Sequence, residues 1–338
     1  GARIRTMGKK PAELNFEEEL NKLEKVIEAN RTFFLAGHVN PDGDTIGCML
    51  ALGSVLKRLG KKVYLYSRDP APDNLGFLRH VKSIKIARPP KGSFDAAILM
   101  ECSTPERGGG DIKDVLKRVG TVVNIDHHKT STAYGDVNVL DMHASSTAEI
   151  IYRLLYDMKV ELNKTEATAL YTGIVTDTGR FHFPATSPRT LDVAARLMQT
   201  GFKFSRINDL LYATKAFESL RVLGRALESL ELLNGGRLAV MTLKHSDFEA
   251  FCARVEHSEN VINYGTMIPG VRMSILFRED PERVNITFRS RGHADVSHLA
   301  RQFGGGGHRN AAGCRMKATL AEAREKVLEA ALPMLKPS

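Results

Sequence analysis

Residues that can hold divalent metal ions gather in four short stretches of the sequence. These are residues 38–44, Glu101, residues 126–128 and residues 176–180. Carboxylate oxygens are the ligands that hard cations such as Mn²⁺ and Mg²⁺ prefer, and imidazole shifts the preference toward Mn²⁺, Fe²⁺ or Zn²⁺. A single acidic pair is more often a turn or a helix cap. Four such stretches in one chain instead favour a metal centre.

The first stretch, H-V-N-P-D-G-D, places two carboxylates two positions apart in a turn. Pro41 stiffens this turn and Gly43 relieves crowding in it, so Asp42 and Asp44 can face different cations. Two cations about 3.5–4 Å apart share a carboxylate, hold an attacking hydroxide and stabilise the leaving oxygen of a phosphate ester. The spacing therefore predicts a two-metal phosphoesterase.

Short apolar runs alternate with helical patterns in the first part of the chain. The runs predict strands at residues 32–36, 62–66, 95–100 and 121–125, and the patterns predict helices at residues 16–30, 47–59, 148–158, 164–175 and 187–200. This alternation is typical of an α/β fold with a parallel sheet between helical layers. Functional groups gather at the carboxyl ends of such strands, where Glu101 and Asp126 lie.

The second part of the chain has a different pattern. Residues 204–233 form a long helical stretch with few breakers, followed by predicted strands at residues 237–243, 271–277 and 283–289 and helices at residues 295–303 and 320–335. A length of 338 residues suits two domains. We predict a metal-binding domain over residues 16–205, a helical linker over residues 206–235 and a smaller α/β domain over residues 236–335.

Composition narrows the setting in which the protein acts. The formal charge of +9 is compatible with a polyanionic partner but does not prove one. The four cysteines form no C-x-x-C pair, and buried free thiols in a reducing cytoplasm explain them best. No apolar run is long enough to span a membrane, and no secretory signal is visible. We therefore expect a cytoplasmic protein without a membrane anchor.

A glycine-rich segment near the C-terminus can bind phosphate. Glycine lets backbone amides approach an anion closely, although a bare run of glycines is more often a flexible turn. Neighbouring arginine, serine and histidine side chains supply cations and hydrogen-bond donors that suit phosphate. The candidate substrate-binding residues are Arg289, Ser290, Gly305, Gly306, His308 and Arg309.

The order of these motifs resembles the DHH phosphoesterase superfamily. The first motif is G-H-V-N-P-D-G-D-T-I-G from Gly37, the second is N-I-D-H-H from Asn124, and the third is G-I-V-T-D-T-G from Gly173. The run F-G-G-G-G-H-R-N-A-A-G from Phe303 resembles the signature of the DHH-associated C-terminal domain. Within the superfamily the chain is most similar to NrnA-like bifunctional oligoribonucleases and pAp phosphatases.

This resemblance implies roles for individual residues. His38 and Asp42 would hold one cation, and Asp44, His127 and Asp177 would hold the other. Both cations would be Mn²⁺ by preference, with Mg²⁺ or Co²⁺ as possible substitutes. The catalytic residues would be His128, which meets the substrate phosphate or its leaving oxygen, Asp126, which orients a neighbouring histidine, and Arg107.

One position departs from the family pattern. The family usually has aspartate as the bridging ligand, followed six residues later by arginine. Here Arg107 is present, but the acid is Glu101. Glutamate keeps the charge and adds one methylene, so Glu101 either bridges both cations or binds only one of them.

The resemblance implies hydrolysis of short single-stranded RNA to mononucleotides and removal of the 3′-phosphate of pAp. One alternative keeps the chemistry but changes the substrate to linear dinucleotides, such as pGpG or pApA, or to short single-stranded DNA. Another is a non-catalytic nucleotide- or RNA-binding module with an impaired metal site. Few aromatic residues beyond Phe288, Phe303 and Tyr264 are available for base stacking in the second domain, which disfavours long strands. A homodimer is possible.

Overall fold

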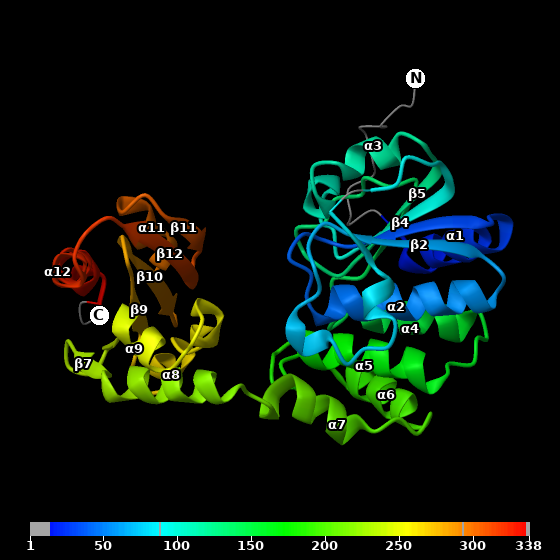
Figure 1. Ribbon diagram of the computed structural model, residues 1–338. Coiled ribbons are helices and arrows are strands. Elements are labelled where there is room, and N and C mark those ends of the chain that lie inside the picture. Colours follow the sequence, from blue (N-terminus) through cyan, green and yellow to red (C-terminus); the bar gives the residue numbers. More distant parts are fainter. Residues whose placement is uncertain (1–13, 88, 293, 336–338) are drawn as a thin grey trace. The chain divides into compact units, whose positions relative to one another are not determined.

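The computed structural model describes residues 14–335 except 88 and 293, and the chain divides into two compact units between Ala213 and Thr214. Each unit is built around its own six-stranded sheet (Figure 1). The mixed α/β class predicted from the sequence is confirmed. Among the described residues, no helix is both long enough and apolar enough to cross a membrane.

The first sheet is entirely parallel. Its strands are β1 (Thr32–Ala36), β2 (Lys62–Ser67), β3 (Lys85–Ile86), β4 (Phe94–Met100), β5 (Val119–Asp126) and β6 (Val137–Leu140), in the order β3-β2-β1-β4-β5-β6. From β1 the chain builds the sheet outward to one edge through β2 and β3, and from β4 it builds outward to the other edge through β5 and β6. The order of the parallel strands therefore switches between β1 and β4. A switch of this kind opens a crevice at the carboxyl ends of the strands, where ligands bind.

Helices cover both faces of this sheet. One face packs against α1 (Phe16–Ala29), α2 (Gly43–Arg58) and α4 (Thr147–Asp157), and α5 (Lys164–Asp177) and α6 (Pro188–Met198) pack on these helices as an outer layer (Figure 1). Helix α3 (Ile112–Leu116) lies on the other face. Alternation along β1 explains the two layers: Phe33 and Leu35 enter the first core, and Phe34 and Ala36 enter the second.

Helix α2 begins earlier than the sequence pattern indicates. The apolar periodicity predicts a start at residue 47, but the helix starts at Gly43. Asp42 caps it, because its side chain accepts a hydrogen bond from the Thr45 amide over 2.9 Å. The expected turn is therefore the first turn of a helix, and Asp44 lies within it.

The long helix expected over residues 204–233 is wrong. The structure has α7 (Phe204–Asn208), a π-helical turn at Asp209–Ala213, a break, α8 (Phe217–Glu228) and the short strand β7 (Glu231–Leu233). Leu211 belongs to the core of the first unit and Val222 to a core of the second. Because the two halves pack on different cores, helical propensity alone cannot keep the segment continuous.

The second unit contains a mixed sheet. The strands β7, β8 (Leu238–Leu243), β9 (Met273–Asp280), β10 (Arg283–Ser290), β11 (Gly306–His308) and β12 (Ala311–Met316) follow the order β11-β12-β10-β9-β8-β7. Among the described strand pairs, β8 and β9 are parallel and the others are antiparallel. The predicted strands β9 and β10 form a hairpin, with Asp280 opposite Arg283.

Helices also cover both faces of the second sheet. The core on one face includes α11 (Val296–Gln302) and α12 (Leu320–Ala331), and the core on the other includes α8 and α9 (His245–Ala250). A short helix, α10 (Asn263–Thr266), contacts β8, β9 and β10.

One cysteine differs from its expected environment. Cys48, Cys102 and Cys314 are buried free thiols, as expected, but Cys252 is exposed. It follows α9 with a φ of 50°, where the chain leaves the helix in a left-handed conformation. This turn carries the thiol away from the core, although its sequence neighbours include the partly buried Phe251.

Candidate metal centre

Side chains from five elements meet at the carboxyl edge of the first sheet. His38 follows β1, Glu101 follows β4, and Asp126 is the last residue of β5. Asp44 lies in the first turn of α2, and Asp177 is the last residue of α5. The sheet topology and two helix ends therefore bring together residues that are far apart in the sequence.

Three overlapping groups have the composition and spacing of metal sites. Within each group the candidate ligand atoms lie within 4.8 Å of one another. The groups are His38–Asp42–Glu101, Asp44–His127–Asp177 and Glu101–His127–His128. Glu101 belongs to two of them, so the arrangement can serve adjacent cations through one shared carboxylate.

Glu101 is held in an unusual conformation. Its φ is 62°, in the left-handed region that costs a non-glycine residue about 1–3 kcal/mol. Its side chain is 1% exposed and accepts a hydrogen bond from the Thr147 hydroxyl. Its two carboxylate oxygens lie 3.6 Å from His127 Nε2 and 3.7 Å from His128 Nδ1. The strained backbone thus directs the carboxylate toward both histidines.

Asp44 is fully buried beneath the N-terminus of α4. The backbone amides of Thr147 and Ala148 donate to its carboxylate over 2.6 and 2.9 Å. Burial raises the pKa of Asp44 well above its usual range, and the nearby carboxylates of Glu101 and Asp177 raise it further. A cation beside Asp44 would offset this crowding of negative charge.

The rings of the two adjacent histidines contact different groups. The Nδ1 atom of His127 lies 3.2 Å from the Ala144 carbonyl, and its Nε2 lies 3.2 Å from Asp177. The Nδ1 atom of His128 instead lies 2.7 Å from Asp126 Oδ1. Burial lowers the pKa of His127, but contacts with Glu101, Asp44 and Asp177 raise it to about 10.

Asp126 is hydrogen-bonded to both histidines. Its Oδ1 atom also accepts hydrogen bonds from the backbone amides of His127 and His128, over 2.8 and 3.2 Å. The hydrogen bond from the His128 ring raises the pKa of that histidine. The His128 side chain is 43% exposed, so a bound molecule can reach its ring.

His38 and Asp42 lie at the more exposed side of the centre. The Nδ1 atom of His38 lies 2.7 Å from the Val39 carbonyl, and its Nε2 lies 3.6 Å from Asp42. Hydrogen bonding at Nδ1 fixes the ring so that Nε2 faces the carboxylates. The Asp42 side chain is 52% exposed, which leaves this side accessible from solvent.

The buried polar atoms of this centre fit divalent cations. Among the described residues, Glu101 Oε2, Asp126 Oδ2 and His127 Nε2 are buried and have no hydrogen-bond partner. Native proteins rarely leave such atoms unsatisfied without a reason. Burial and the neighbouring carboxylates raise the pKa of Asp177 to about 6. A cation would satisfy the unpaired ligand atoms and neutralise the carboxylates.

Arg107 is joined through its backbone to the loop that leads into the centre. It lies in the 3₁₀ turn Pro105–Gly108, and its carbonyl accepts a hydrogen bond from the Val39 amide over 2.7 Å. This bond joins the turn after β4 to the loop that carries His38. The residue as a whole is exposed, so its side chain is accessible at the surface.

The predicted substrate-binding residues of the second unit gather at one edge of its sheet. In the strand register, Ala311 of β12 pairs with Arg289 of β10 and with His308 of β11, so these two residues flank the same position. Arg309 follows His308 directly and is exposed. The structure therefore brings together the arginine and histidine residues that the sequence separates.

Other members of this predicted set have structural contacts. The Ser290 hydroxyl donates to the Ala294 carbonyl over 2.7 Å and lies 3.0 Å from the Asn310 side-chain amide. A Cβ atom at Gly305 would collide with the Gly313 carbonyl, whereas one at Gly306 would meet open space. Close packing against Gly313 therefore explains the glycine at position 305, whereas the space beside Gly306 is open.

Sequence reasoning missed three residues that contact the centre. They are Ala144, Thr147 and Ala148, whose backbone or hydroxyl groups reach His127, Glu101 and Asp44. The signal available was Ser146, a serine just before an apolar helical pattern, which the structure shows as the N-cap of α4. That pattern indicates a helix start but not the carboxylate that the helix faces.

Comparisons with known proteins agree with this geometry. The description "DHH family, N-terminal domain" matches residues 32–174, and the DHHA1 domain matches residues 238–336. The chain is 33% identical to "Bifunctional oligoribonuclease and PAP phosphatase NrnA" of Thermus thermophilus, over 94% of this chain and 95% of that protein. Its identity to the Bacillus subtilis protein of the same name is 30%, over 86% and 91%.

A solved structure shares the architecture of both units. It is an exopolyphosphatase-related protein from Bacteroides fragilis, with a TM-score of 0.84 and 27% identity over 95% of this chain and 98% of that one. The similarities span nearly the whole chain, and the two domain matches occur in the same order as the two structural units. The chain therefore belongs to the DHH phosphoesterase family, among its members that carry a DHHA1 domain.

Proposed function

We propose that this protein hydrolyses short oligoribonucleotides to mononucleotides and removes the 3′-phosphate of pAp. The observation that carries the proposal is the set of three overlapping groups of candidate cation ligands, two of which contain Glu101. The names of the Thermus and Bacillus relatives support the choice of substrates. Oligoribonucleotides and pAp both present a phosphate ester next to a ribose, so one centre can act on both.

The proposed ligand set follows the overlapping groups. His38 and Asp42 would hold one cation, and Asp44, His127 and Asp177 would hold the other. Glu101 groups with His38 and Asp42 and lies 3.6 Å from His127 Nε2, so it would contact both cations. Mixed carboxylate and imidazole ligands suit Mn²⁺ best, with Mg²⁺ or Co²⁺ as substitutes. The cations would supply Lewis-acid stabilisation of the phosphate and activation of water.

The protein's own groups would then position the phosphate and move a proton. The accessible ring of His128, oriented by Asp126, would donate a proton to the leaving oxygen. The Asp126 contact raises the pKa of His128 and so favours the protonated form that this role needs. We also propose a catalytic role for Arg107, whose exposed side chain would engage a phosphate.

The second unit would bind the part of the substrate that is distant from the cations. Arginine side chains engage phosphate bidentately, and glycine amides add donors at close range. We propose Arg289, Ser290, Gly305, Gly306, His308 and Arg309 for this role. The four free cysteines support a reducing compartment such as the cytoplasm.

A side-by-side assay tests the proposal. The purified full chain, supplied with Mn²⁺, is given pAp, diribonucleotides, pGpG, pApA and short single-stranded DNA. We expect turnover of pAp and diribonucleotides, and loss of that turnover in the Asp126→Ala/His127→Ala variant. Preference for pGpG, pApA or DNA would replace the substrate assignment. Binding without any hydrolysis would instead support a non-catalytic module.

A further inference from the structure

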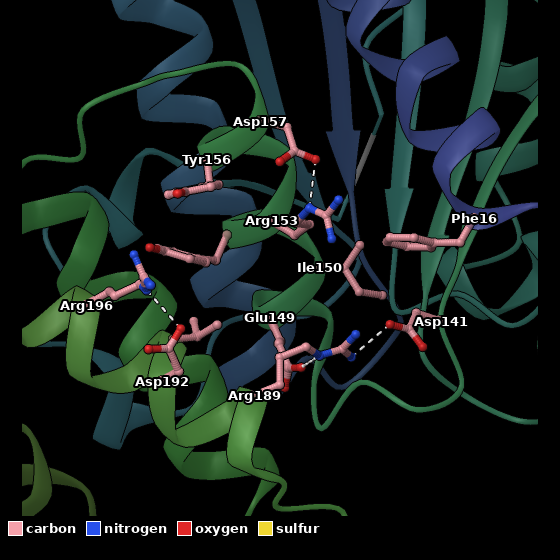
Figure 2. Close-up of a pocket in the computed structure, with 12 residues that line it drawn as sticks. Phe16, Asp141, Glu149, Ile150, Arg153, Tyr156, Asp157, Arg189, Asp192 and Arg196 are labelled. Atoms are coloured by element: carbon pink, nitrogen blue, oxygen red, sulfur yellow. Dashed lines mark hydrogen bonds and ion pairs between the residues drawn. The ribbon is translucent and has the colours of Figure 1, made fainter.

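A surface pocket of about 320 Å³ in the first unit reaches a buried carboxylate that lies behind the metal centre. The pocket is lined by residues of α1, α4 and α6 together with Asp141, which follows β6 (Figure 2). At its base Arg189 of α6 points at both Glu149 of α4 and Asp141 (Figure 2). The Glu149 side chain is 2% exposed, whereas that of Arg189 is 49% exposed.

Glu149 connects the pocket to the loop between β6 and α4. Its Oε1 atom pairs with Arg189. Its Oε2 atom accepts hydrogen bonds from the Ser145 hydroxyl over 2.7 Å, the Ser145 amide over 3.2 Å and the Thr190 hydroxyl over 2.9 Å. One buried carboxylate therefore ties α6 to the residue just before the N-cap of α4.

Arg189 fastens the other end of the same loop. Its guanidinium donates to Asp141 over 2.8 Å. Asp141 in turn accepts a hydrogen bond from the His143 amide over 2.9 Å, and its carbonyl accepts one from Ala144 over 3.1 Å. Its own amide donates to the Asp126 carbonyl over 3.1 Å. The Arg189–Glu149 pair is thus hydrogen-bonded to both ends of the loop, Arg189 to Asp141 and Glu149 to Ser145.

The fastened loop and the first two residues of α4 contact three of the proposed cation ligands. The Ala144 carbonyl lies 3.2 Å from His127 Nδ1, opposite the nitrogen that faces the carboxylates. The Thr147 hydroxyl donates to Glu101, and the Thr147 and Ala148 amides donate to Asp44. Any shift of this loop would turn a ligand imidazole and displace two ligand carboxylates together.

We propose that Glu149 and Arg189 are positioning residues of the metal centre, which hold the loop of residues 141–147 and the N-terminus of α4 against His127, Glu101 and Asp44. This inference rests on the proposed metal centre. Groups that orient metal ligands by hydrogen bonding typically contribute about 10- to 100-fold to metal affinity or activity. The pair has the connections to act in this way, although neither residue is a ligand itself.

The same pocket contains a matched control. Arg196 lies on α6, as Arg189 does, and pairs with Asp192 over 2.8 Å within that helix (Figure 2). Its guanidinium also lies 5.7 Å from the centre of the Tyr156 ring. These contacts stay at the surface of the pocket and do not involve the loop. Arg196→Met therefore removes an ion pair of the same helix without loosening the centre.

The experiment measures Mn²⁺ binding by the metal-free full chain with electron paramagnetic resonance of free Mn²⁺. Wild type, Arg189→Met, Arg189→Lys, Glu149→Gln and Arg196→Met are titrated at a temperature at which thermal unfolding in EDTA shows each to be folded. We expect Arg189→Met and Glu149→Gln to bind Mn²⁺ at least about tenfold more weakly. Arg189→Lys should recover part of the affinity, and Arg196→Met should match wild type.

Two results would overturn the inference, and they are distinguishable. If wild type binds Mn²⁺ and Arg189→Met binds as tightly as Arg196→Met, the positioning role is wrong while the metal centre stands. If wild type itself binds no Mn²⁺, the proposed metal centre fails and the positioning role fails with it. Should Glu149→Gln not fold, the comparison of Arg189→Met, Arg189→Lys and Arg196→Met still decides between these outcomes.

Discussion

Glu101 belongs to two of the three overlapping groups of candidate cation ligands. Its positive φ and full burial place a carboxylate where both His127 and His128 lie within 4 Å. The Thr147 hydroxyl holds one carboxylate oxygen, and the other lacks a hydrogen-bond partner. One oxygen of the Glu101 carboxylate is therefore available for a cation.

Replacing this carboxylate by an amide tests the shared role. Glu101→Gln removes the negative charge but keeps the size, so we predict a loss of Mn²⁺ affinity and turnover beyond the roughly 100-fold typical of residues that only orient ligands. Calorimetric titration with Mn²⁺ and pAp turnover are the measurements. Glu106→Gln is the control, because Glu106 is exposed and pairs with Lys113 away from the centre. Turnover close to wild type in Glu101→Gln would refute the role.

At the scale of elements, the centre depends on the close packing of α2 against α5. Glycines allow this approach: a Cβ atom at Gly47 would collide with the Ala169 carbonyl, and one at Gly43 would collide with Thr176. Gly173 of α5 faces Asp44 in the first turn of α2. The helices that carry Asp44 and Asp177 are therefore packed with their backbones in close contact.

Gly173→Ala tests this packing. The new Cβ would lie 2.6 Å from Asp44 Oδ1 and 2.8 Å from the Ala148 Cβ, so the helices must separate. We predict a lower melting temperature in EDTA, equivalent to about 1–3 kcal/mol, together with weaker Mn²⁺ binding. Gly224→Ala on α8 is the control, since its Cβ would meet nothing within 4 Å and helix propensity would stabilise it by up to about 1 kcal/mol. Equal effects of the two substitutions would contradict the packing argument.

Strands β1 and β4, whose carboxyl ends lie at the centre, are hydrogen-bonded to each other at their amino ends. Asp95, just after the start of β4, accepts hydrogen bonds from the Arg31 and Thr32 amides over 2.9 and 2.8 Å, and its own amide donates to the Thr32 hydroxyl. The two backbone hydrogen bonds lower the pKa of Asp95 below its usual 3.8. This contact aligns β1 and β4, which end near His38 and Glu101.

The lowered pKa predicts a pH-dependent contribution to stability. A carboxylate with a depressed pKa stabilises the folded state above its unfolded pKa, and that stabilisation is lost as the pH falls through the folded value. Because solvent screens this exposed carboxylate, Asp95→Asn should destabilise the protein by less than about 1 kcal/mol near neutral pH, and progressively less below about pH 4. Melting temperatures across this pH range, with Asp73→Asn of an exposed aspartate as control, measure the effect. A difference that grows on acidification would contradict it.

At the scale of the whole molecule, the proposed metal centre and the proposed substrate-binding residues lie in separate units. Phe288 is fully buried, so it offers no surface for base stacking, whereas Tyr264 is 41% exposed. With few exposed rings in the described part of the second unit, stacking on a long strand is disfavoured, and a short substrate held through its phosphate is favoured. The proposed preference for short RNA is thus a property of both units together.

His308→Ala tests the division between the units. Because His308 belongs to the second unit, we predict a KM for diribonucleotides raised at least about tenfold, with unchanged Mn²⁺ affinity. Wild-type rates should fall as RNA lengthens from two to about 24 nucleotides. His298→Ala, an exposed histidine on α11, is the control. A loss of Mn²⁺ affinity in His308→Ala, or faster cleavage of the longest RNA, would contradict the division.

The amino-acid sequence determined the features that depend on local pattern. Apolar runs such as residues 32–36 and 95–100 predicted the central strands, and the polar residues that follow them predicted the centre. A strand records its burial in its own residues, and parallel strands place their carboxyl ends at one edge. The identity of Glu101 was likewise visible in the chain, but not its left-handed backbone.

Only the tertiary structure decided the features that depend on contacts between distant residues. The expected long helix at residues 204–233 is broken because its halves pack on different cores. The bonds from α4 to Asp44 cross more than a hundred positions of the sequence, and Arg189 reaches Glu149 across 40. The periodicity of a local segment does not predict such pairs, because these hydrogen bonds form only after the sheet has brought the helix ends together.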